Sequence, residues 1–231
     1  MTFSVIGRSG TGEQFGIAIS SSSPAVAARC SHARSGVGVV ASQNITDPRL
    51  GPEILARLRA GVSASDALTS VLAATRHASY RQVLALGRTG AAAVHSGSQT
   101  LGIFSAVIGM DCAAAGNLLA NDRVPQRMVV AFEGTRGPLP ERLLAALAAG
   151  RAAGGEAGPV HSAGIVVVRD VDWPIVDLRV DWSEQDPIGE LASLYRLYAP
   201  QIEDYVCREL DPSHAPGFGV AGDPGLETNR S

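Results

Sequence analysis

Val37-Gly38-Val39-Val40-Ala41 is a run of small and β-branched apolar residues, and Gly164-Ile165-Val166-Val167-Val168 is a second run of the same kind. Both runs are apolar at odd and at even positions, which is typical of strands in a sheet that is covered on both faces. Strand-like segments come in groups separated by pairs of helical segments, so a doubly wound parallel sheet is disfavoured. The pattern predicts an α+β fold with two mostly antiparallel sheets packed face to face and helices outside.

Around these runs, the alternation of apolar residues and turn signals predicts the other elements. Strands are expected at 2–7, 14–22, 37–43, 82–86, 91–95, 104–110, 112–115, 163–168 and 175–180. Helices are expected from Pro52 to the turn at Gly61, after a cap at Ser63, and at 124–132, 140–149, 186–198 and 200–210. Residues 1–210 are interpreted as one domain, and 211–231, rich in Pro, Gly, Asp and Ser, as an extended or disordered tail.

The composition narrows the functional class. The 231 residues carry 22 acidic and 19 basic side chains, for a formal net charge of −3, so no basic surplus favours binding to nucleic acid or to an anionic membrane. Three widely spaced cysteines indicate reduced thiols, and neither a signal peptide nor an apolar run long enough to span a membrane is expected. The five histidines lack the spacing of metal ligands, so we expect no metal and no cofactor in a cytoplasmic protein.

Thr2 follows Met1 directly and begins the first predicted strand. Removal of Met1 would give a threonine whose own α-amine, with a reference pKa of about 7.7–8.0, can accept the proton of its hydroxyl. This is the minimal form of an N-terminal nucleophile for attack on an amide or ester. The competing interpretation is an edge-strand threonine, because β-branched residues suit strands.

Such a site also needs a cation and a donor for the developing oxyanion. All 19 basic side chains are arginines, so a catalytic lysine is excluded, and Arg34 or Arg29 would have to supply the positive charge. Asn117 follows Gly116 at the end of a predicted strand and is a candidate oxyanion donor. A solvated arginine and an ordinary Gly-Asn turn are the structural alternatives.

Substrate-binding candidates lie at the ends of two other predicted strands. Gln43 and Asn44 close one of them, and alternate serines of the run that begins at Ser20, namely Ser20 and Ser22, would face one side of another. Each could line a pocket near Thr2. Polar residues at strand ends are more often simply solvated, and serines before a proline commonly end a strand.

Several short stretches are similar to a known bacterial family. They are Met1-Thr2-Phe3-Ser4, residues 22–26, 36–43, 51–52, 61–64 and 116–119, the Ala153-Gly154-Gly155 turn, and Val176-Asp177-Leu178-Arg179-Val180-Asp181. The order and number of these stretches make the chain resemble the domain of unknown function 1028 family over roughly residues 1–200. The resemblance implies the four-layer αββα sandwich of the N-terminal-nucleophile hydrolases, without implying a reaction. Members often have Gln-Ser-Ala where this chain has His161-Ser162-Ala163.

Together these features suggest an N-terminal-threonine amidohydrolase acting on an unknown small amide. Thr2 would be the nucleophile, with Asn117 and Arg34 assisting it. The alternative is a non-catalytic binding or assembly protein on the same fold. We expect a homodimer, the commonest symmetric state.

Overall fold

Two antiparallel sheets form the middle of the structure, a computed structural model in which residues 2–223 are described. The larger sheet has the order β10-β9-β2-β1-β8-β7 and the smaller β3-β4-β5-β6. The strands of the larger sheet are β1 (Thr2–Arg8), β2 (Phe15–Ser21), β7 (Ser105–Gly109), β8 (Cys112–Asn117), β9 (Ser162–Val168) and β10 (Pro174–Val180). Those of the smaller are β3 (Ser31–Arg34), β4 (Gly38–Asn44), β5 (Arg81–Gly87) and β6 (Ala93–Ser96).

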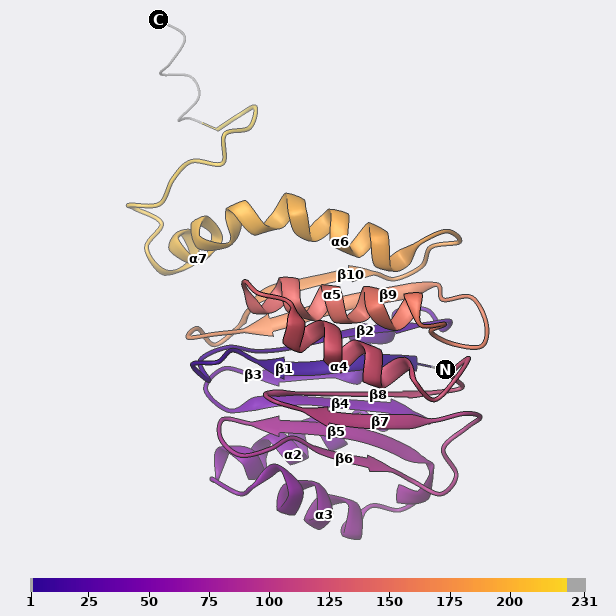
Figure 1. The fold of residues 1–231 in the computed structure, drawn as a ribbon. Helices are drawn as coiled ribbons and strands as arrows, with labels where there is room; N and C mark the ends of the chain where they lie inside the picture. Colours follow the sequence, from indigo (N-terminus) through magenta and orange to yellow (C-terminus); the bar gives the residue numbers. More distant parts are fainter. Residues whose placement is uncertain (1, 224–231) are drawn as a thin grey trace, which may run out of the picture. The chain divides into compact units, whose positions relative to one another are not determined.

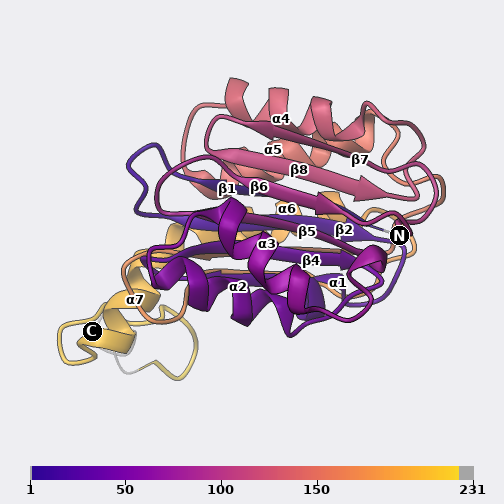
Figure 2. The ribbon, with the colours of Figure 1, turned by 90° about the horizontal axis from the view of Figure 1, so that it is seen from below.

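Helices cover the outer faces of both sheets. Helices α4 (Val124–Gly134) and α5 (Leu139–Ala152) pack on the larger sheet, as Figure 1 shows. Helices α2 (Leu50–Arg59) and α3 (Ala64–Ala74) lie across β4, β5 and β6 of the smaller sheet (Figure 2). The predicted cap is confirmed, because Ser63 Oγ accepts a hydrogen bond from the Asp66 backbone N–H. The predicted α+β sandwich with helices outside is therefore confirmed.

The space between the sheets is an apolar core. Ile6, Ile17, Ile19, Val39 and Leu84 are fully buried there. The opposite faces of these strands are also buried, against the helices, which explains why the strand sequences are apolar at every position. Each sheet is thus an inner layer that positions the polar residues at its strand ends.

One segment differs from the prediction. Between the strands predicted at 14–22 and 37–43, where the sequence predicts no element, the chain forms a short helix, α1 (Val26–Cys30), and then the edge strand β3. Helix α1 is only five residues long, and Ala25 before it has a left-handed backbone with φ of 51°. Neither element has a local signal in the sequence, because pairing of β3 with β4 and packing of α1 on β9 determine them.

By its contacts the chain divides into two compact units, Met1–Ser193 and Leu194–Ser231. The remaining helices are α6 (Pro187–Tyr198) and α7 (Ile202–Leu210). The predicted single domain over 1–210 and tail over 211–231 stay predictions, and residues 224–231 of that tail lie outside the described residues. Within residues 2–223, no helix has the length and apolar character needed to cross a membrane.

Candidate functional site

Thr2 begins β1, an inner strand of the larger sheet, and pairs with Asn117 at the end of β8. Side chains alternate along β1, so Thr2 and Ser4 share the face of Ile6, which lies in the core between the sheets. Phe3 points the other way, toward Gly150 of α5. Thr2 is 4% exposed and Asn117 is fully buried. The predicted nucleophile and the predicted asparagine therefore meet at one end of the interlayer space.

A chain of hydrogen bonds joins the two sheets at this end. Ser4 Oγ donates to Gln43 Oε1 at 2.6 Å, and Gln43 Nε2 donates to Gln82 Oε1 at 2.8 Å. Asn117 Nδ2 donates to the same Gln82 oxygen at 3.1 Å, and Gln82 Nε2 donates to Ser96 Oγ at 3.0 Å. Gln43, predicted to bind substrate, is thus brought near Thr2, but its amide is occupied by the protein itself.

The direction of these bonds fixes the orientation of the Asn117 amide. Gln82 Oε1 is an acceptor, so the Asn117 nitrogen must face it. Asn117 Oδ1 then lies buried with no hydrogen-bond partner among the described residues. Because a buried acceptor without a donor is costly, this oxygen is suited to accept a hydrogen bond from an N–H or O–H group. The Asn117 nitrogen is thus occupied by Gln82, and the predicted role of Asn117 as an oxyanion donor stays a prediction.

Glu156 is a further polar group at this end that the sequence did not reveal. It lies in the glycine-rich loop after α5 and is 4% exposed. The Ser22 backbone N–H, one residue beyond the end of β2, donates to its two carboxylate oxygens at 3.1 and 3.3 Å. Burial raises the pKa of Glu156 to about 6, although the hydrogen bond from Ser22 acts in the opposite direction.

We expect Glu156→Gln to stabilise the protein at neutral pH. The pKa of this carboxyl is about 6 in the folded chain against a reference of 4.5, so its contribution to stability is complete below pH 4.5 and is lost as the pH rises through 6. Glutamine keeps an acceptor for Ser22 without the buried charge. The free energy of unfolding from urea titrations should exceed that of the unmodified chain by about 2 kcal/mol at pH 7.5 and match it at pH 4.

The control is Glu13→Gln, in an exposed turn. It should change the unfolding free energy by less than about 0.5 kcal/mol at either pH. Equal stability of Glu156→Gln and the unmodified chain at pH 7.5 would contradict the raised pKa.

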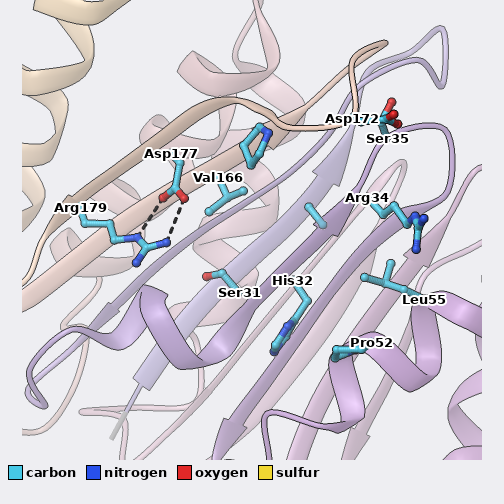
Figure 3. Close-up of a pocket in the computed structure, with 12 residues that line it drawn as sticks. Ser31, His32, Arg34, Ser35, Pro52, Leu55, Val166, Asp172, Asp177 and Arg179 are labelled. Carbon is cyan, nitrogen blue, oxygen red and sulfur yellow. Dashed lines mark hydrogen bonds and ion pairs between the residues drawn. The ribbon is translucent and has the colours of Figure 1, made fainter.

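The predicted cation does not reach Thr2. Arg34 pairs with Gly38 at the start of β4, whereas Gln43 near the other end of β4 is bonded to Ser4. Arg34 therefore lies at the opposite end of the smaller sheet, where it lines a cleft (Figure 3). Arg29 is occupied in α1, where its Nη1 donates to the carbonyl oxygens of Pro24 and Ala25. Arg34 lies far from Thr2 because β3 runs antiparallel to β4, so that the last residue of β3 pairs with the first residue of β4.

The serines and Asn44 also differ from the expected arrangement. Ser20 pairs with Phe3 and so faces the helices, and its Oγ donates to the Ser162 carbonyl. Asn44 is used structurally, since its Nδ2 donates to the Tyr80 carbonyl at 2.6 Å. Ser22 lies beside Glu156, whose carboxylate accepts a hydrogen bond from the Ser22 backbone N–H. In residues 2–223, no cluster of three or more His, Cys, Asp or Glu side chains is suited to hold a metal ion.

The comparisons with known proteins cover most of the chain, including all the strands of both sheets. The model of the family of unknown function DUF1028 matches residues 2–191. A crystal structure of a DUF1028 protein from Silicibacter pomeroyi is similar, with 31% identity, a TM-score of 0.81, and 88% of this chain and 89% of that chain covered. Anbu (ancestral beta-subunit) from Yersinia bercovieri is a distant structural neighbour, with 13% identity, a TM-score of 0.41, and 86% and 97% covered.

No match was found among curated proteins. The match of the family model covers most of the chain, and the Silicibacter pomeroyi structure agrees with it in sequence and in fold. The chain therefore belongs to the DUF1028 family.

Proposed function

We propose that this chain is an N-terminal-threonine amidohydrolase that acts on a small amide once Met1 has been removed. The observation that carries the proposal is the pairing of Thr2 with Asn117, whose Oδ1 is buried without a partner among the described residues. An α-ammonium or α-amine at Thr2 is a hydrogen-bond donor of the kind that this oxygen lacks. Asn117 would orient the α-amine, which is the base in this chemistry.

The reaction would proceed in two balanced steps. Thr2 Oγ attacks the amide carbon, its proton passes to the α-amine and then to the leaving nitrogen, and the amine departs from an ester of Thr2. Water then attacks the ester, the α-amine takes a proton from it, and the acid leaves as Thr2 Oγ is protonated again.

A mass measurement on protein from the native host tests the first requirement. The intact mass and N-terminal sequence should show that Thr2 is the first residue. An epoxyketone that traps a neighbouring hydroxyl and amine should then label Thr2 stoichiometrically. A chain that keeps Met1 in its native host, or that starts at Thr2 and takes no label, would refute the proposal.

A second candidate function is binding or assembly without catalysis. It is supported by the low exposure of Thr2, 4%, and by the position of the 670 Å³ cleft at Arg34 rather than at Thr2. Retention of Met1 in the native host would favour this function.

A further inference from the structure

The two outer strands of the larger sheet differ in how their edges are protected. Among the described residues, this sheet ends with β10 on one side and with β7 on the other (Figure 1). Strand β10 begins with Pro174 and carries Asp177 and Arg179, residue types that keep an exposed edge from pairing with another chain. Residues 96–110, which include β7, contain no charged residue and no proline. The edge at β7 therefore lacks these protecting residues.

Large apolar side chains are exposed along this side of the sheet. Phe104, Ile108 and Met110 are 41%, 50% and 78% exposed. Leu101 and Ile103, also exposed, continue the line, because their carbonyl oxygens accept hydrogen bonds from the N–H groups that follow β8. At about 200 Å² for a large side chain, these five residues, here called the apolar edge, expose on the order of 500 Å². A standard interface buries about 800 Å² per partner, so the apolar edge supplies much of the area that a stable dimer needs.

The extent of the smaller sheet explains why this surface is uncovered. Ala106 and Ile108 pair with Ala115 and Ala113 of β8, which belong to the core between the sheets. The side chains of Ala106 and Ile108 are therefore on the face that is directed toward the smaller sheet. That sheet ends at β6, a strand of four residues, and leaves Ile108 half exposed. The core between the sheets thus reaches the molecular surface at the apolar edge.

The backbone of β7 also presents hydrogen-bonding groups outward. Strands β7 and β8 are joined by a two-residue turn, so Gly109 and Cys112 form a hydrogen-bonded pair, and the two kinds of pair alternate from there. Ala106 and Ile108 therefore lie in non-hydrogen-bonded pairs with β8, and their N–H and C=O groups are directed away from it. A strand on the outer side could bond to these groups.

We propose that β7 pairs antiparallel with β7 of a second copy of this chain, so that the larger sheets of the two chains become continuous. A two-fold axis at Val107 places Ala106 opposite Ile108 of the partner subunit, so a small residue meets a large one. Phe104 then faces Met110 of the partner subunit, a favourable contact between an aromatic ring and a sulfur atom. Two uncharged edges meet without repulsion, whereas an acidic or basic partner would find no opposite charge here. The inference does not rest on the proposed function, because assembly is measured without turnover.

Sedimentation velocity of the full chain at about 50 μM tests the assembly. The main species should have twice the mass of one chain. Ile108→Lys puts a charge on the apolar edge and should weaken the dimer at least about 100-fold. Leu197→Lys, at a residue of the second unit that is 71% exposed, is the matched control and should leave the dimer intact. Circular dichroism should show that both variants are folded. A monomer, growth into larger species as the concentration rises, or a dimer that persists in Ile108→Lys would overturn the proposal.

Engineered cysteines test the register of the two strands. In a chain with Cys207→Ser, Val107→Cys should form a disulfide between two chains on mild oxidation, because residue 107 lies opposite itself across the axis. Ala106→Cys is the control and should not link, because its counterpart lies two residues along the partner strand, more than about 7 Å away between Cα atoms. Cys30 and Cys112 are buried and should not react. Faster linkage of Ala106→Cys than of Val107→Cys would overturn the two-fold pairing at Val107.

Discussion

Gln82→Leu is expected to lower the free energy of unfolding by about 3–5 kcal/mol, the largest loss of stability from a single polar residue in this sandwich. Gln82 is fully buried, and its amide makes four hydrogen bonds that span both sheets. Leucine would fill much of the volume but would leave Asn117 Nδ2 without an acceptor and Ser96 Oγ without its donor. Each buried group so abandoned costs about 1–3 kcal/mol.

Urea unfolding followed by circular dichroism measures the loss. The control is Gln99→Leu, an exposed loop residue, which should change the unfolding free energy by less than about 0.5 kcal/mol. Combining Gln82→Leu with Asn117→Leu should cost less than the sum of the single changes, because the second substitution removes the group that the first leaves unsatisfied. If Gln82→Leu lowers the free energy of unfolding by less than about 1 kcal/mol, water has replaced the hydrogen bonds of the amide and the expected loss is wrong.

The inner strands were predictable because their signal is local. The runs at Val37–Ala41 and Gly164–Val168 are apolar on both faces, and only a covered sheet accommodates that. The same property hid the orientation of β2. Phe15, Ile17 and Ile19 face one side of the sheet, and Gly16 and Ala18 face the other. Because both sets are apolar, the sequence does not indicate which face of the sheet each of the following serines lies on. The expectation that Ser20 faces the site of Thr2 was therefore wrong.

Residues of the site were predictable only where they end a recognisable strand. Thr2 and Asn117 both do, and antiparallel pairing brings them together. Arg34 precedes an apolar run, and only the antiparallel return of β3 decides which end of the sheet it reaches. Glu156 comes from a loop with no periodic pattern, and its burial depends on the Ser22 N–H, which is distant in the sequence. Topology, rather than residue type, determined these outcomes.

Thr2→Val is expected to lower the rate of epoxyketone labelling by at least about 10³-fold. Valine keeps the β-branched shape at the start of β1 but removes the only atom of this residue that can attack a carbonyl. The α-amine remains, so loss of labelling would isolate the contribution of the hydroxyl. Intact mass must show that Met1 is absent in each variant, because a retained methionine would block the amine in every case.

Two further variants decide whether the buried amide beside Thr2 takes part. Thr2→Ser retains hydroxyl and amine and should still be labelled. Asn117→Leu removes the acceptor that we assign to the α-amine, so labelling should slow, and the labelling pH profile should shift because the amine loses a hydrogen bond to its charged form. Asn117 is hydrogen-bonded to Gln82 whatever its catalytic role. If the role of Asn117 is purely structural, Asn117→Leu will lower stability and leave the labelling pH profile unchanged. If Thr2→Val is labelled at the rate of the unmodified chain, Thr2 is not the nucleophile.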